Sequence, residues 1–243
     1  MDDINAIYAV TGAPAYTIRE QLAQREDSWL REIAMGREIG VNPELVREEL
    51  IDGIADKLAS KELLRQYLLN FSRQELEFFR EASDEREIRR DDLFPSRYGI
   101  SLVNGLLSLY YHDGGYLCVV PEEIRAAFHD LERTSFPADW ERCDLLRTYG
   151  RAVTEFYGVI KIADVIDIFN AQNDEPTNEV EFSKAVSCGR EELGELVVEE
   201  EYLFSDLVFE DADWEEIENL AHEAARKPRY IPSRDEVFEF PHF

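Results

Sequence analysis

Four histidines and 53 carboxylates are the residues of this chain that could carry acid–base chemistry. The histidines are His112, His129, His222 and His242. A histidine works near neutral pH when a nucleophile or a metal ligand stands at a suitable spacing, and none of the four has such a neighbour in the sequence. Two carboxylates can hydrolyse a bond when their surroundings separate their pKa values, but the sequence singles out no pair.

Motifs that bind phosphate or activate a serine are absent from the sequence. It has no phosphate loop with glycine and lysine, no nucleophile elbow and no glycine fingerprint for a dinucleotide. Cys118, Cys143 and Cys188 are far apart and form no CxxC pair, so we expect reduced, packed thiols. We therefore predict a protein that is not an enzyme and uses no cofactor and no metal. A hydrolase based on carboxylates is the alternative.

An acidic stretch between Arg190 and Arg226 contains no lysine or arginine and is the most informative feature. Apolar residues are interleaved with its acids, so we expect it to be folded with the carboxylates on its surface. This surface could meet a basic partner, be only a solvated face, or hold a hard cation, although no EF-hand spacing occurs. The candidate partner-binding face consists of Glu195, Glu199, Glu200, Glu201, Asp206, Glu210, Asp211 and Glu215.

The charge of the whole chain favours the same class of partner. Its formal net charge of −27 repels nucleic-acid phosphates and anionic membranes and favours a basic protein surface. No apolar run approaches the roughly 20 residues that cross a bilayer. The start, Met1-Asp2-Asp3-Ile4, lacks the basic and apolar parts of a secretory signal. We expect a cytoplasmic protein that binds neither membranes nor nucleic acid, and its oligomeric state stays open.

Helical spacing of apolar residues dominates the first half of the chain. One helix is expected around Trp29–Ala34, ending near Gly40. A second is expected from Asn42-Pro43 to Leu58, with Asn42 as its N-cap, so that the two form a helical hairpin. Further helices are expected at 63–71, from the capping box at 72–75 onward, and at 100–109.

A tight hairpin is expected at Asp113-Gly114, which lies between two runs of β-prone residues. Pro121 opens the next helix, and the turn Ser135–Ala138 marks a boundary. The second half has the same order of helices, hairpin and helix, so a duplication is an open hypothesis. Its expected elements are helices at 139–156, 161–172 and 178–187, strands at 196–198 and 202–204, a capping box at 213–216, and a last helix capped by Ser233 and Glu236.

Several segments resemble known modules. Trp29–Ala34, the corner Ile39-Gly40-Val41 and Arg47–Ile54, with its Glu-Leu-Ile triplet, together resemble the small motif of Rho-N and SAP domains. That resemblance implies a helical hairpin, which in this family often binds nucleic acid. The run from Leu106 to Glu123 resembles the wing of winged-helix proteins.

The chain as a whole is similar to bacterial and phage-type proteins of unknown function, through features such as Phe156–Ile160 and Tyr230–Ser233.

The predicted fold is mostly α with short β-hairpins, in three parts. Residues 1–60 are expected to form the N-terminal helical segment, 61–135 a winged-helix-like module, and 136–243 a second such module with the acidic stretch. The predicted function is non-catalytic protein interaction through the acidic face. The alternatives are a winged-helix transcriptional regulator that binds DNA, an acidic mimic of DNA, and the carboxylate-based hydrolase.

Overall fold

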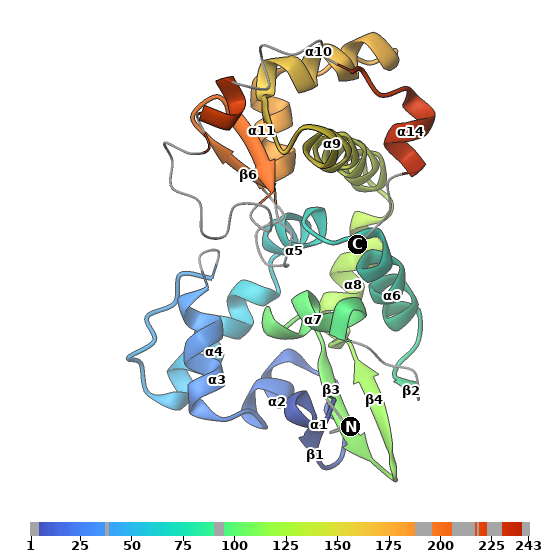
Figure 1. Cartoon of the computed structure of the whole chain (residues 1–243). Helices are drawn as coiled ribbons and strands as arrows, with labels where there is room; N and C mark the ends of the chain where they lie inside the picture. The colour runs from blue at the N-terminus through green and yellow to red at the C-terminus, as the bar shows by residue number, and fades with distance from the viewer. Residues whose placement is uncertain are drawn as a thin grey trace. The chain divides into compact units, whose positions relative to one another are not determined.

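Helices make up most of the chain, and short strands form two small sheets (Figure 1). The computed structural model describes residues 5–36, 39–89, 95–187, 196–205, 217, 219–222 and 230–239. The chain divides into two units, Met1–Pro137 and Ala138–Phe243. Within the described ranges, no helix combines the length and the apolar character needed to cross a bilayer.

Reciprocal capping boxes start two helices of the first unit. The Thr17 and Glu20 side chains each accept a hydrogen bond from the other residue's backbone amide. Ser72 and Glu75 form the same pair of hydrogen bonds. The second box confirms the predicted helix start. The early elements are α1 (Asn5–Tyr8), β1 (Val10–Thr11), α2 (Ile18–Ala23), α3 (Asp27–Met35), α4 (Arg47–Leu58), α5 (Lys61–Leu69) and α6 (Arg73–Asp84).

Helix α4 packs against α3 but does not begin where the sequence predicted. It starts at Arg47, and its N-cap is Val46, which has no capping side chain. Instead, the Asn42 Oδ1 atom accepts a hydrogen bond from the backbone amide of Glu44 at 3.0 Å, and this bond closes a local turn. The prediction of Asn42 as the N-cap was wrong. The sequence Asn-Pro is favourable both in a turn and at the start of a helix, and here it forms a turn. Helix α3 also ends before Gly40.

The predicted turn Asp113-Gly114 is confirmed. It joins β3 (Ser108–His112) to β4 (Gly115–Val119), and its two residues have φ angles of 49° and 75°. Two successive left-handed residues match the twist of a tight hairpin, and Asp-Gly tolerates them. The sheet has the order β1-β3-β4-β2, where β2 is Ile88–Arg89. Strand β1 runs parallel to β3, and the other pairs are antiparallel.

One predicted helix end and one predicted turn near this hairpin were wrong. Helix α7 (Pro95–Val103) ends before residue 109 because the chain turns through Gly105 at a φ of 71°. After α8 (Glu122–Leu131), the expected turn Ser135–Ala138 is mostly helical, because α9 (Phe136–Tyr157) starts within it. The boundary predicted there nevertheless agrees with the division between the two units, which falls after Pro137. Pro137 lies in the first turn of α9, where its missing N–H breaks no helical hydrogen bond.

The second unit contains the predicted helices and hairpin, together with one strand that was not foreseen. This strand is β5 (Val159–Lys161), and it pairs antiparallel with β7, giving the order β5-β7-β6. The Ser233–Glu236 cap is confirmed, since each backbone amide donates to the other side chain, at 2.7 and 3.3 Å. The other elements are α10 (Ile162–Gln172), α11 (Glu179–Ser187), β6 (Leu196–Glu199), β7 (Tyr202–Ser205) and α14 (Arg234–Glu239). The capping box predicted at 213–216 lies outside the described residues.

A hydrophobic core packs against one face of the β6–β7 hairpin. Leu196 and Leu203 join a cluster of buried side chains from α9, α10 and α11. A Cβ at Gly150 of α9 would lie 2.7 Å from Leu196 Cδ1, so the bare backbone of Gly150 lets the hairpin approach α9 closely.

Candidate functional site

The free end of the β6–β7 hairpin carries three consecutive glutamates. Glu199 pairs with Tyr202, which leaves Glu200 and Glu201 as a two-residue turn. All three glutamates are exposed, whereas Leu196 and Leu203 anchor the hairpin in the core. We call Glu199, Glu200 and Glu201 the acidic tip. The strand register therefore brings three adjacent carboxylates to one exposed turn.

The backbone of the acidic tip adopts a conformation that glutamate rarely takes. Glu200 has a φ of 50°, in the left-handed region. For a residue with a side chain, this region costs about 1–2 kcal/mol because Cβ approaches the following carbonyl oxygen. The position would suit glycine better.

Lys161 of β5 braces one carboxylate of the acidic tip. Its Nζ donates to Glu201 Oε1 at 2.6 Å and lies 5.3 Å from the centre of the Tyr202 ring. The hydrogen bond to Glu201 is the main cause of a raised Lys161 pKa. Because the two side chains are 41% and 61% exposed, this pair orients Glu201 more than it stabilises the fold.

The other two carboxylates of the acidic tip lack a counter-ion within the described ranges. Neither Glu199 nor Glu200 forms an ion pair there, so one lysine faces three glutamates. The uncompensated charge is directed to solvent and is available to a positively charged group.

The structure places part of the predicted acidic face and leaves the rest undescribed. It brings Glu199, Glu200 and Glu201 together. The remaining predicted residues, which lie outside the described part of the chain, are Glu195, Asp206, Glu210, Asp211 and Glu215. Lys161 was not predicted to act at this site, because its place follows only from the pairing of β5 with β7.

The groups with acid–base or redox potential are dispersed. His129 Nε2 lies 3.1 Å from the Ser83 carbonyl oxygen, and His112 lies 3.5 Å from Asp113. Burial raises the pKa of the Cys118 thiol to about 12, so it stays protonated and unreactive at neutral pH. Across the ranges that the structure describes, no three histidine, cysteine or acidic side chains gather as metal ligands would.

Comparison with protein-family models, with curated proteins and with solved structures gives no match to this chain. The chemistry of its own residues is therefore the basis for a functional proposal.

Proposed function

We propose that this protein is a non-catalytic module that binds a basic surface of a partner protein through the acidic tip. The observation that carries the proposal is a turn of three exposed glutamates with one lysine beside them. Complementary charge speeds the encounter of two proteins and fixes their register. Such binding weakens as salt rises, because the Debye length falls to about 8 Å at physiological ionic strength.

The order of the elements supports a winged-helix-like scaffold with the hairpins as wings. In the second unit, β5 follows α9 and pairs with the second strand of the hairpin that comes after α10 and α11. In the first unit, β2 follows α6 and pairs with the second strand of the hairpin that comes after α7. This shared order also favours the duplication hypothesis.

Direct DNA binding is the second candidate function, because winged-helix proteins often use it. Helix α11 would be the helix that reads DNA, and its first turn carries Glu179 and Glu181. Arg142 donates to both Glu181 oxygens, at 2.9 and 3.0 Å, so this cation is already paired. An acidic helix and an acidic wing repel phosphates. The charge therefore favours mimicry of DNA, in which carboxylates take the place of phosphates, over binding to it.

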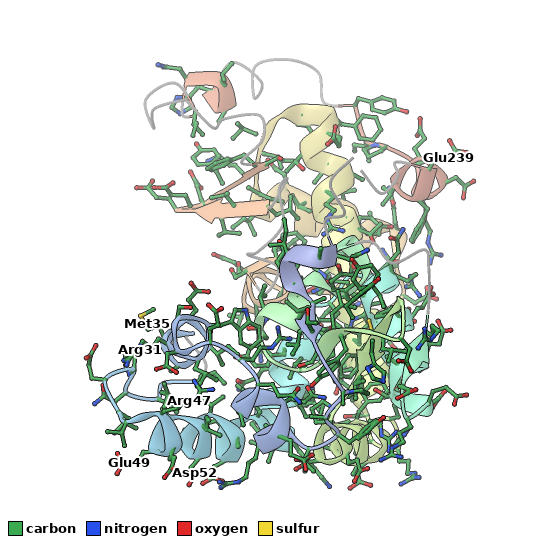
Figure 2. The ribbon with its side chains drawn as sticks, turned by 90° about the horizontal axis from the view of Figure 1, so that it is seen from below. Arg31, Met35, Arg47, Glu49, Asp52 and Glu239 are labelled. Carbon is green, nitrogen blue, oxygen red and sulfur yellow. The ribbon has the colours of Figure 1, made fainter. Side chains whose placement is uncertain are left out.

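The resemblance of α3 and α4 to the Rho-N and SAP motif supports a role as scaffold. Figure 2 shows Arg31 of α3 and Arg47 at the start of α4. Arg31 donates to the Pro43 carbonyl, and Arg47 pairs with Asp27. Both guanidinium groups are engaged within the chain, which lowers their availability for phosphates.

A cytoplasmic location belongs to the same proposal. Cys118, among the described cysteines, is a buried free thiol, as is usual in a reducing compartment.

Binding to an immobilised lysine-rich peptide at low and high salt tests the acidic tip. The variant with Glu199→Gln and Glu200→Gln should bind about tenfold more weakly than the wild type, since removing two charges costs about 1.4 kcal/mol. The matched control combines Glu48→Gln with Glu49→Gln, two exposed neighbours on α4 that change the net charge equally. Equal binding by the two variants would contradict the proposal.

A gel-shift assay with random duplex DNA at low salt separates the two candidate functions. We expect no shift from the wild type. A salt-sensitive shift would favour the DNA-binding regulator over the protein-interaction module.

A further inference from the structure

Arg25, between α2 and α3, is a buried cation that no carboxylate of the described residues neutralises. Only 9% of the residue is exposed, and its guanidinium stacks on the Trp29 ring at 4.3 Å from the ring centre. Nη1 donates to the Tyr8 carbonyl at 3.1 Å. Burial lowers the Arg25 pKa, and the neighbouring group that raises it is the Tyr110 phenol. In a chain with 53 acids, this cation lacks an acidic partner within the described ranges.

The unpartnered atoms of Arg25 lie on one edge of its guanidinium. Nε and Nη2 are buried and make no hydrogen bond within the described part of the chain. These two nitrogens point their N–H groups in the same direction and form the side-on fork. That fork matches the two oxygens of a carboxylate or phosphate group, whereas a single carbonyl oxygen uses only one donor. The Nε/Nη2 edge of Arg25, which suits an oxyanion, is therefore the edge that makes no hydrogen bond within the described residues.

Tyr110 is a further buried donor in the neighbourhood of Arg25, since its phenol influences the Arg25 pKa. It lies in β3, opposite Val10 of β1, and is fully buried, and its hydroxyl makes no hydrogen bond of normal geometry within the described ranges, although the Ala15 amide and Ser108 are close to it. Burial raises the pKa of Tyr110, although the Ala15 amide, Arg25 and Ser108 oppose the rise. The hydroxyl therefore keeps its proton at neutral pH and can donate it in a hydrogen bond.

We propose that Arg25 and Tyr110 form a binding site for a small oxyanion, a carboxylate or phosphate group. The anion would accept two hydrogen bonds from the Arg25 edge and one from the Tyr110 hydroxyl. A buried charge without a counter-ion destabilises a fold, and a bound anion removes that cost.

Titration of the full chain with inorganic phosphate and with acetate, against chloride at equal ionic strength, tests the site. Tryptophan fluorescence reports binding, because Trp29 stacks on Arg25. A thermal melt reports stabilisation, because a ligand that binds only the folded state raises Tm. The wild type should give a saturable fluorescence change and a rise in Tm. Trp29→Phe should lose the fluorescence change that belongs to the site.

Three variants assign the response to the site. Arg25→Lys keeps the charge but loses the fork, so its response should disappear. Tyr110→Phe should weaken the affinity about tenfold, the effect of one lost hydrogen bond to a charged group. Arg19→Lys changes an arginine that is 55% exposed and pairs with Asp52, and it should respond like the wild type.

Each outcome decides the proposal. A saturable response to acetate alone assigns a carboxylate ligand, and a response to phosphate alone assigns a phosphate ligand. No response beyond chloride overturns the site, and an equal response from wild type and Arg25→Lys would mean an adventitious ion only. Should Arg25→Lys fail to fold, unchanged affinity in Tyr110→Phe would also overturn it.

Discussion

The two hairpins solve the same geometric problem with opposite residue choices. Both strand pairs are closed by a two-residue turn whose first residue is left-handed, with a φ of 49° at Asp113 and 50° at Glu200. The first turn uses Asp-Gly, which tolerates this geometry, and the second uses Glu-Glu, which does not. A residue that is unfavourable for the turn but supplies charge indicates a use other than turn stability.

The strands of both hairpins are largely buried, but the contacts around them differ. At the first turn, Arg89 reaches the carbonyls of His112 and Asp113 at 3.4 Å, a contact made by a long and exposed side chain. The second hairpin packs its strands into the core against α9, beside Gly150. A firm anchor below a strained tip is consistent with a tip that presents charge in a defined direction.

The largest expected effect is that of a side chain at Gly150. Gly150→Ala should destabilise the protein by about 2 kcal/mol, because its Cβ would overlap Leu196 in a packed core. Chemical denaturation measures the change. Gly115→Ala is the control in the first hairpin, since its Cβ would meet only the mobile end of Arg89, at 2.8 Å from Nη1. Equal losses in the two variants would show that the close approach of Leu196 to Gly150 adds nothing to the cost.

The next effect concerns the glycine of the first turn. Gly114→Ala should cost about 1.5 kcal/mol, because alanine is strained at a φ of 75°. Denaturation again measures it. Asp113→Asn should be almost neutral, since asparagine also tolerates the left-handed region. If Gly114→Ala left the free energy of unfolding unchanged, the turn would not depend on a glycine at this position.

A smaller effect is expected at the ion pair that starts α11, the helix packed against β6. Glu181→Gln should cost about 1 kcal/mol after allowance for solvent screening. The hydrogen bonds from Arg142 are the main cause of a Glu181 pKa below its ordinary value of 4.5. A lowered carboxyl pKa contributes stability that is present above 4.5 and is lost as the pH falls through the folded-state pKa.

Stability measured against pH therefore separates the wild type from this variant. The difference between them should be constant at neutral pH and should disappear on acidification. A difference that persists in acid would assign the effect to packing instead of charge.

The smallest expected effect is a gain. Glu200→Gly should stabilise the protein by about 0.5 kcal/mol, since glycine accepts the left-handed backbone but loses more entropy on folding. The same variant should weaken binding to the lysine-rich peptide. Glu201→Gly is the control, and it should destabilise, because Glu201 lies outside the left-handed region and pairs with Lys161. If Glu200→Gly lowered the stability instead, the backbone of Glu200 would not be strained.

Local signals in the sequence predicted the elements that depend on neighbouring residues. The capping boxes at Ser72 and Ser233 and the turn at Asp113-Gly114 are confirmed, since each is closed within a few residues. Asn42 and the Ser135–Ala138 turn were misread because the same residue types suit both helix starts and turns. The three-part domain division and the winged-helix assignment stay predictions.

The sequence by itself determined the charge of this protein, its helical character and the run of glutamates that becomes the acidic tip. Only the tertiary structure decided that β5 brings Lys161 to Glu201, and that β1 lies parallel to β3. It also decided that Arg25 is buried and has no carboxylate partner among the residues that the structure describes. The reason is physical: propensity, capping and turn chemistry act over a few residues. Burial and pairing depend on segments that the chain brings together only when it folds.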